Sequence, residues 1–487
     1  MAPGFSDIFE EARLSARALL DYGESFFNPT VRLGVTGLSR AGKTVFITAL
    51  IHGLTRGGRF PVFEAFSSGR IARAQLAPQP DDAVPRFDYE NHLHTLIGER
   101  RWPNSTVDIS ELRLVVDYQR RNGAERTLTL DIVDYPGEWL LDLPLLNKTF
   151  AQWSAESLAL SREPPRAHLA AAWHAHLSTL LALDRQDEQA TLASAKLFTD
   201  YLRACRDERF AMSLLPPGRF LMPGNLADTP ALTFAPLDVS ADGTTPDGSL
   251  WAMMRRRYEA YKDVVVRPFF RDHFARLDRQ IVLVDALAAF NAGPEALHDL
   301  EAALTGILDC FRIGRSTLFS TLFRPRIDRI LFAATKADHL HHSSHDRLEA
   351  VLRRAVIRAA DRAEHSGAAI DVVALAAVRA TREATVARGR DKLPSILGMP
   401  APGEIANGET FDGNTEVATF PGDLPSDPEA LFKGEFRGLS STPSEKADFR
   451  FLRFRPPQLE RDGEDEPALP HIRLDRALQF LIGDRLL

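Results

Sequence analysis

Residues 37–44, with the sequence GLSRAGKT, match the pattern GxxxxGK[ST] in full. Glycines in such a loop let backbone N–H groups converge on phosphate oxygens, and the positive end of a following helix adds to the attraction. The side chain of Lys43 would reach the β- and γ-phosphates of a nucleotide, and the hydroxyl of Thr44 would bind Mg²⁺. The residues expected to contact the nucleotide here are Gly37, Leu38, Ser39, Arg40, Ala41, Gly42, Lys43, Thr44 and Val45.

A second motif, LDIVDYPG, places Asp134 at the end of an apolar stretch and Gly137 three residues later. A carboxylate at the end of a strand can hold the hydration shell of Mg²⁺, as a Walker-B aspartate does. The backbone N–H group of Gly137 can face the γ-phosphate. On its own the motif would indicate an ordinary Pro-Gly turn. Because a phosphate-binding loop precedes it in the chain, we interpret Asp134 as a metal-binding residue.

The third motif, TKAD, contains Thr335, Lys336 and Asp338 and matches the pattern [NT]KxD. Guanine presents its N1–H group and its exocyclic amine side by side, so the carboxylate of Asp338 can accept both hydrogen bonds. Adenine has an acceptor at N1 and lacks this pair of donors. The stem of Lys336 can lie along the base. Since the three motifs each follow a predicted strand, where ligands of open α/β sheets bind, together they favour a guanine nucleotide.

Two further contacts are expected at less distinctive positions. The strand AIDVVALAA should lead into a loop whose backbone, at Ala377 and Val378, touches the guanine carbonyl group. A threonine that senses the γ-phosphate through Mg²⁺ should precede the strand ELRLVVDY. Thr106 is our first choice, with Ser105 and Thr95 as rivals, and a solvated loop hydroxyl is an equally open interpretation.

The elements that must position these motifs form an α/β pattern. Apolar strand-like segments alternate with segments of helical periodicity, which predicts a mostly parallel sheet covered on both faces. The fold expected is a three-layer P-loop core with a helical insertion and a small C-terminal extension. The predicted strands are VRLGVTGL, ELRLVVDY, ERTLTLDIVDY, RQIVLVDAL, DRILFAAT, AIDVVALAA and RFLRFRPP.

The segments suggest four parts. Residues 1–144 hold a leading helix and the half of the nucleotide-binding core with the phosphate loop. Residues 145–276 have helical periodicity with few strand signals, which indicates a mostly helical insertion. Residues 277–397 return to alternating strands and helices and complete the core. Residues 398–487 are rich in turn residues and end in a predicted strand, RFLRFRPP, and a closing helix, LDRALQFLIGDRLL.

Composition narrows the environment and the partners. The chain has 487 residues, 44% of them hydrophobic, and a formal net charge of −7, so no overall basic field would recruit nucleic acid. Cys205 and Cys310 form no CxxC pair, which favours buried thiols in a reducing compartment. No apolar run is long enough to cross a bilayer. We therefore expect a cytoplasmic protein, for which peripheral membrane attachment stays open.

The segments GLSRAGKT, LDIVDYPGEW, PPGRFLMPG, TKADHLHH and PHIRLDRALQFLIGD together resemble the YcjX-like family of bacterial P-loop proteins. The resemblance runs along nearly the whole chain, and PPGRFLMPG and the C-terminal segment are its specific part. It implies a stress-associated cytoplasmic nucleoside triphosphatase with a Ras-like core and a helical insertion. Members have often been labelled ATPases, whereas TKAD favours guanine.

The catalytic group is the main departure from the Ras-like pattern. Glu138 follows Gly137 where Ras-like proteins usually have a glutamine that orients water. A glutamate can accept a proton from water, but its charge beside the γ-phosphate should slow hydrolysis. Arg40, inside the phosphate loop, is a candidate arginine finger, although an outward salt bridge is the favoured interpretation. Arg100 and Arg101 are the other candidates.

The predicted function is a GTP-binding protein that hydrolyses GTP slowly with Mg²⁺. An ATPase, or a nucleotide-binding scaffold without turnover, is the alternative. The expected ligands are GTP or GDP and Mg²⁺, and an unidentified protein partner would contact the helical insertion or the C-terminal extension. The histidines after TKAD more simply cap the next helix, and metal binding there stays open; they are His339, His341, His342 and His345.

Overall fold

The computed structural model describes most of the chain. The described residues are 29–38, 40–104, 108–180, 185–227, 229–238, 246–310, 327–364, 368–388, 391–406, 408–435, 451–459 and 467–487. The leading helix expected in residues 1–28 lies outside these ranges, as do Ser39, Ser105 and Thr106.

A seven-stranded sheet forms the centre of the molecule, in the order β2-β3-β4-β1-β5-β6-β7. In this order, every neighbouring pair from β4 to β7 is parallel. The pairs β2–β3 and β3–β4 are antiparallel. The strands are β1 (Thr30–Gly37), β2 (Ile71–Ala77), β3 (Ser110–Gln119), β4 (Glu125–Asp134), β5 (Arg279–Val284), β6 (Arg329–Ala334) and β7 (Ala369–Ala374). The mostly parallel sheet is confirmed. The edge strand β2 was not predicted, because its sequence IARAQLA is half exposed and lacks a clear apolar alternation.

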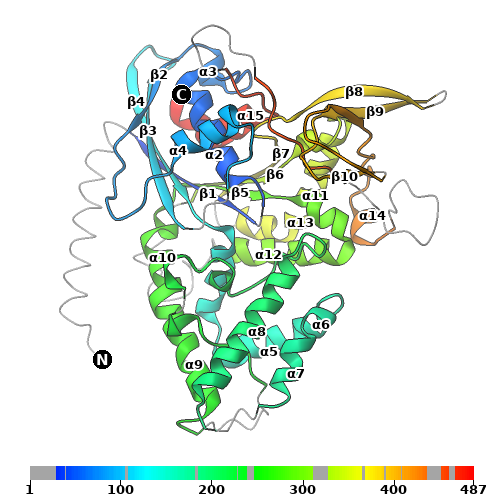
Figure 1. Cartoon of the computed structure of the whole chain (residues 1–487). Helices are drawn as coiled ribbons and strands as arrows, with labels where there is room; N and C mark the ends of the chain where they lie inside the picture. Colours follow the sequence, from blue (N-terminus) through cyan, green and yellow to red (C-terminus); the bar gives the residue numbers. More distant parts are fainter. Residues whose placement is uncertain are drawn as a thin grey trace.

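Helices cover both faces of the sheet (Figure 1). On one face lie α2 (Lys43–Arg56) and the C-terminal helix α15 (Leu474–Ile482). On the other lie α12 (Pro294–Cys310) and α13 (His345–Glu364). The predicted three-layer arrangement is therefore confirmed, including the closing helix.

Residues 281–284 of strand β5 show why part of a central strand is apolar at successive positions. Ile281 and Leu283 pack into the core under α2 and α15, whereas Val282 and Val284 pack into the opposite core. Successive side chains of a strand point to opposite faces, so a strand buried on both sides needs apolar residues at every position. Packing on both faces holds the strands in place, and with them the carboxyl ends at which the three motifs lie.

Residues 145–276, the segment between the second motif and β5, are largely helical in their described part and contain no named strand there (Figure 1, lower half). Its helices are α5 (Phe150–Arg162), α6 (Arg166–Leu169), α7 (Ala171–Leu177), α8 (Glu188–Arg206), α9 (Leu250–Tyr261) and α10 (Arg267–Asp272). Its aromatic residues Trp153 and Phe198 belong to the same hydrophobic cluster as Val282 of the sheet. The helical segment thus shares a core with one face of the sheet, and the division into four parts stays a prediction.

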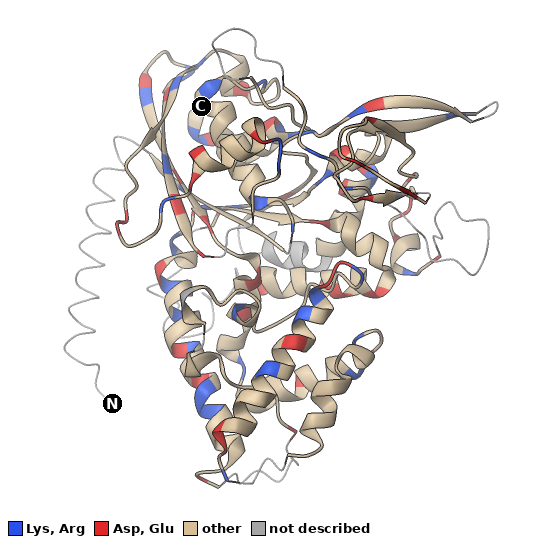
Figure 2. Cartoon of the chain, in the orientation of Figure 1, with Lys and Arg blue, Asp and Glu red and all other residues tan. Residues whose placement is uncertain are grey.

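The surface of the helical segment carries charges of both signs. Figure 2 shows blue and red positions interspersed along α8 and α9. On α8, Asp200 accepts from Lys196 at 2.6 Å and from Arg203 at 3.2 Å. Such exposed pairs on one helix contribute little to stability, roughly 0.3–0.5 kcal/mol each.

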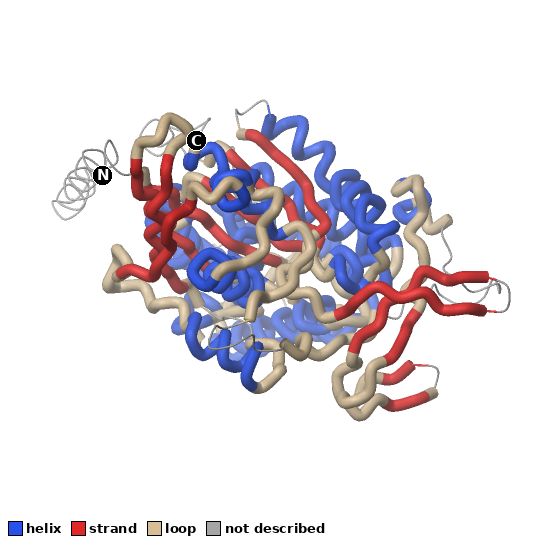
Figure 3. The backbone as a smooth tube through the Cα atoms, turned by 90° about the horizontal axis from the view of Figure 1, so that it is seen from above, coloured by secondary structure: helices blue, strands red, loops and turns tan. Residues whose placement is uncertain are grey.

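The chain after β7 differs from the prediction in two places. An antiparallel hairpin, β8 (Thr381–Arg388) and β9 (Asp391–Gly398), projects from the body in Figure 3 and pairs with β12 (Val417–Thr419). The strand predicted as RFLRFRPP is wrong: residues 451–459 contain no strand, only an isolated bridge from Phe454 to Pro400. The segment is held by long-range contacts that its own apolar pattern does not reveal.

Among the helices of the described residues, none combines the length and the apolar character that a bilayer crossing requires.

Candidate functional site

The three motifs meet in one cavity of about 450 Å³ at the carboxyl edge of the sheet. The predicted site residues that line it are Gly37, Leu38, Arg40, Ala41, Gly42, Lys43, Thr44, Val45, Glu138, Thr335, Lys336, Asp338, Ala377 and Val378. Strands β1, β4, β6 and β7 end at this edge because they are parallel, so segments far apart in sequence become neighbours. A cavity of this size suits a small-molecule ligand.

Two residues of the second motif, Asp134 and Gly137, contact the phosphate loop. Gly42 has a φ of 78° directly before α2, a left-handed conformation that favours glycine. Gly137 touches the loop so closely that a Cβ atom on it would lie 2.3 Å from the carbonyl oxygen of Gly37. The ammonium group of Lys43 pairs with the carboxylate of Asp134, which is 1% exposed. Asp134 and Gly137 therefore contact the loop without lining the cavity, and Asp134 is the counter-ion of Lys43.

The residues predicted to bind Mg²⁺ are partly assembled. Thr44 lines the cavity, and its hydroxyl donates to the carbonyl oxygen of Asn104 at 3.4 Å. The Oδ2 atom of Asp134 is buried and, among the described residues, has no hydrogen-bond partner. A buried carboxylate oxygen of this kind is costly unless a cation or donor satisfies it. A hard oxygen-ligand set suits Mg²⁺, so these two residues fit the ion, whereas Thr106 lies outside the described residues.

The third motif is rigidly held. Lys336 has a φ of 60°, an uncommon value for a residue with a side chain, and its ammonium group lies 2.5 Å from Asp285 Oδ2. Asp338 is 5% exposed, and its Oδ2 atom accepts a hydrogen bond of 2.9 Å from the backbone N–H of Ala380. The hydroxyl of Thr381 donates to the Asp338 carbonyl oxygen at 2.5 Å. These contacts fix the carboxylate where it lines the cavity.

The loop after β7 is tied to the C-terminal segment. Ala376 and Ile472 exchange two backbone hydrogen bonds of 3.1 and 2.8 Å. The N–H group of Arg379 donates to the carbonyl oxygen of Pro470 at 2.7 Å. The segment PHIRLDRALQFLIGD, noted in the sequence as family-specific, thus braces the loop predicted to touch the base.

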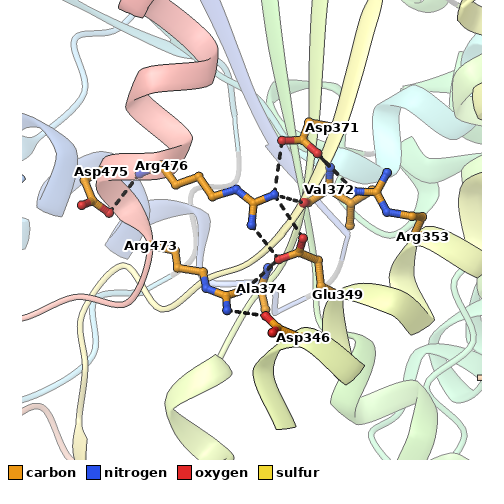
Figure 4. Close-up of polar contacts among 9 residues, drawn as sticks. All are labelled: Asp346, Glu349, Arg353, Asp371, Val372, Ala374, Arg473, Asp475 and Arg476. Atoms are coloured by element: carbon orange, nitrogen blue, oxygen red, sulfur yellow. Dashed lines mark hydrogen bonds and ion pairs between the residues drawn. The ribbon is translucent and has the colours of Figure 1, made fainter. Parts of the chain in front are cut away.

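An ion-pair network anchors the same C-terminal segment to the sheet and to α13 (Figure 4). Arg473, at the start of α15, pairs with Asp346 at 2.5 Å and with Glu349 at 2.7 Å. Arg476 pairs with Glu349 at 3.1 Å and with Asp371 of β7 at 3.5 Å. Sharing of Glu349 by two arginines couples helix α15 to α13, the helix that follows TKAD.

Glu138 lines the cavity together with Lys43 of the phosphate loop and is 8% exposed. Burial raises the pKa of its carboxyl group, and the nearby cations Arg206 and Lys43 lower it. Gly218, from PPGRFLMPG, packs so tightly on this residue that a Cβ atom would lie 1.9 Å from the Glu138 carbonyl oxygen. The helical segment therefore packs directly against the backbone of Glu138.

The candidate arginine fingers from the sequence point elsewhere or sit at the margin. Arg40 pairs outward with Glu208 at 3.3 Å, and its side chain is 56% exposed, which agrees with the favoured interpretation. Arg100 donates to the carbonyl oxygen of Pro456 at 3.3 Å. Arg101 is exposed. Arg206 also lines the cavity and pairs there with Glu138. The sequence did not single it out, because it ends a helix remote from every motif.

An aromatic wall of the cavity was also missed. Trp102 and Phe454 both line it, and the indole N–H of Trp102 donates to the Phe454 carbonyl oxygen at 2.6 Å. The ring of Phe454 meets that of His339 edge-on at 5.5 Å. Only the fold brings these distant residues together, so no local pattern could have identified them.

The histidines after TKAD separate into two groups. His341, His342 and Glu383 bring their ligand atoms within 4.8 Å of one another. His342 already pairs with Glu383 at 2.8 Å, which accounts for the cluster without a metal. His345 lies apart and contacts the carbonyl oxygen of Leu340. Metal binding by this cluster stays an open, untested alternative.

The arrangement defines the class of protein. A GxxxxGK[ST] loop between β1 and α2, an aspartate at the end of β4 and TKAD after β6 surround one cavity of a mostly parallel sheet. This is the architecture of a Ras-like P-loop protein.

Comparison with known proteins identifies the family. The model of the YcjX-like family, DUF463, matches residues 31–486, and the chain belongs to this family. The protein called Ras-like GTPase YcjX in Escherichia coli (strain K12) is 37% identical over 476 residues, which cover 94% of this chain and 96% of that protein. The protein of the same name in Shewanella oneidensis is 33% identical over 486 residues, which cover 94% of each chain.

Proposed function

We propose that this protein binds GTP and hydrolyses it slowly with the help of Mg²⁺. The observation that carries the proposal is that Lys43 and Asp338 line the same cavity, one at each end of a possible nucleotide. Both curated relatives are named Ras-like GTPases, which supports the same choice.

The base end supports guanine over adenine. Asp338 is held in place by Ala380 and Thr381, and a carboxylate oxygen that accepts one hydrogen bond retains a second lone pair. The two donors on the guanine edge can therefore bind this carboxylate without displacing its backbone contact. The backbone of Ala377 and Val378 would lie near the guanine carbonyl group.

The phosphate end supplies charge and a place for the metal ion. Phosphates that bind in the loop would replace Asp134 as the partner of Lys43. They would also accept hydrogen bonds from the N–H groups that precede α2. Thr44 and Asp134 would hold Mg²⁺, directly or through its waters. When bound, Mg²⁺ neutralises charge on the β- and γ-phosphates.

Hydrolysis would depend on Glu138. Its carboxylate can accept a hydrogen bond from the attacking water, but its negative charge opposes the approach of the γ-phosphate. This is why we propose slow turnover and a molecular switch. A stress-related role in the cytoplasm, with a protein partner at the helical segment or the C-terminal region, is the expectation that the family resemblance adds.

Thermal unfolding with competing nucleotides tests the ligand. A ligand that binds the native state raises the melting temperature by mass action. With Mg²⁺ present, excess GTP or GDP should raise the melting temperature and equal ATP should not. Equal protection by ATP and GTP would replace this proposal with an ATPase.

Single-turnover phosphate release tests the chemistry. Glu138 is the feature that favours a scaffold without turnover. If GTP binds but no phosphate forms during many hours, the protein is such a scaffold. Slow release that requires Mg²⁺ supports the GTPase.

A further inference from the structure

Arg206 is the last residue of α8 and carries a charge from the helical segment into the cavity. It lines the cavity together with Lys43 and Glu138. Its Nη1 atom lies 3.8 Å from Oε1 of Glu138, and its side chain is 29% exposed. The guanidinium group is thus sheltered but still reaches the space beside the phosphate loop.

Within the described residues, the contacts of Arg206 involve few of its N–H donors. A guanidinium group has five N–H donors. Within the described part of the chain, Arg206 contacts the sulfur of Met222 at 3.6 Å, a weak acceptor, and Glu138 at a distance beyond a good hydrogen bond. An arginine with such weak contacts can pair with an anionic group at a small cost in free energy, because few interactions are lost.

The other arginines that border this region are committed to contacts of their own. Arg40 pairs with an exposed glutamate on the outer side of the loop. Arg219 stacks on the ring of Trp139, 3.1 Å from its centroid. Arg453 pairs with Glu404 at 2.6 Å. Arg206 is therefore the arginine best placed to serve the phosphate end.

We propose that Arg206 is a catalytic residue, an arginine supplied in cis by the helical segment that contacts the terminal phosphate during hydrolysis. The proposal rests on the GTPase function proposed above. In the reaction, a water oxygen bonds to the γ-phosphorus while the bond to the β–γ bridging oxygen breaks. The products are GDP and inorganic phosphate, and the water proton passes to a phosphate oxygen. Arg206 would donate to the charge that builds on the transferred group.

The position of Arg206 also explains how a glutamate can be tolerated at position 138. Lys43 is paired with Asp134, whereas Arg206 pairs with the Glu138 carboxylate at 3.8 Å. Arg206 can turn from Glu138 to the phosphate without leaving the cavity that both line. Because α8 carries this group, a displacement of the helical segment would change the rate of hydrolysis.

The test compares variants of the full-length protein in single-turnover GTP hydrolysis with Mg²⁺. Arg206→Ala and Arg206→Gln should each reduce the rate by about a thousandfold or more, which is the lower end of the range for arginine fingers. Arg206→Lys should recover part of the rate, because it restores the charge without the planar fork. GDP affinity should change less than about threefold, since GDP lacks the terminal phosphate.

Arg203→Ala is the matched control, because Arg203 lies on the same helix, is exposed and pairs with Asp200. Its rate should equal that of the wild type. A double variant, Arg206→Ala with Glu138→Gln, separates phosphate contact from mere neutralisation of Glu138. The proposal requires that the double variant stay slow.

Three results would overturn the proposal. The first is an unchanged rate in both Arg206→Ala and Arg206→Gln while the wild type binds and hydrolyses GTP. The second is full recovery of the rate in the double variant, which would make Arg206 only a counter-ion of Glu138. The third is equal loss in Arg203→Ala. Failure of the wild type to bind GTP would instead refute the proposed function on which this inference rests.

Discussion

The hydroxyl group of Tyr261, in α9, donates a hydrogen bond of 2.6 Å to Oδ2 of Asp142. Asp142 lies in the 3₁₀ segment η2 (Gly137–Asn147), which begins with the last glycine of LDIVDYPG. The same carboxylate accepts from the N–H group of Gly218 at 2.6 Å. One buried carboxylate therefore joins the segment that carries Glu138 to two parts of the helical segment.

This carboxylate makes stability depend on pH. Burial raises the pKa of Asp142 to about 6, from its ordinary value of 3.8. Between these values the native state holds a proton that the unfolded state has lost, so the free energy of unfolding falls as pH rises. The loss is on the order of 3 kcal/mol, absent below about pH 4 and complete above about pH 6 to 7.

Denaturant unfolding of wild type and Asp142→Asn at pH 4.5 and 7 measures this effect. The asparagine cannot ionise, so its stability relative to wild type should improve at the higher pH. A difference between the two proteins that stays constant with pH would show that Asp142 does not titrate in this range. Asp200→Asn, at an exposed carboxylate on α8, is the control.

Lys43→Ala should abolish binding of GTP while the protein stays folded. The lysine supplies a point charge for phosphate and is not part of a hydrophobic cluster. Asp134 loses its ion pair in this variant, so a modest decrease in melting temperature is expected. Calorimetric titration with GTP provides the measurement, and unchanged affinity would remove the phosphate-site assignment. Lys196→Ala, an exposed lysine on α8, should bind normally.

Asp338→Asn should weaken GTP and favour xanthosine triphosphate. The asparagine oxygen can keep the bond to the N–H group of Ala380, and its amide then faces the base, where it can donate to the xanthine carbonyl. Loss of the charged two-bond contact with guanine should cost a few kcal/mol. Competition binding with both nucleotides measures the switch. Asp346→Asn, at an exposed carboxylate, should leave the preference unchanged.

Glu138→Gln should speed single-turnover hydrolysis of GTP or leave it unchanged. The substitution removes a negative charge beside the γ-phosphate and keeps a group that can hold water. Burial disfavours the charged form of this carboxyl group and raises its pKa, and the substitution removes that charge. If the variant binds GTP but loses activity, Glu138 is the catalytic base and the slow-switch proposal must be abandoned.

Arg40→Ala should change the hydrolysis rate little, because Arg40 pairs outward with Glu208. An arginine that acted as a true finger would lower the rate by about a thousandfold or more when removed. The single-turnover assay used for Glu138→Gln distinguishes these outcomes directly.

The sequence by itself determined the class of fold and most of the predicted cavity lining. The phosphate loop, LDIVDYPG and TKAD are local patterns, and the strands that carry them show either apolar alternation, as in β1 and β4, or a nearly continuous apolar run, as in β6. Parallel strands then force the motifs to one edge of the sheet. Local chemistry and one topological rule were enough for this part.

The tertiary structure alone decided the rest of the site. Arg206, Trp102 and Phe454 reach the cavity from segments that carry no motif. The edge strand β2 and the hairpin β8–β9 have mixed polar sequences, and their pairing with neighbours defines them. The bonds between Ala376 and Ile472 join residues about a hundred positions apart. Such contacts come from the sum of many weak packing energies across the whole fold, which a pattern of neighbouring residues does not contain.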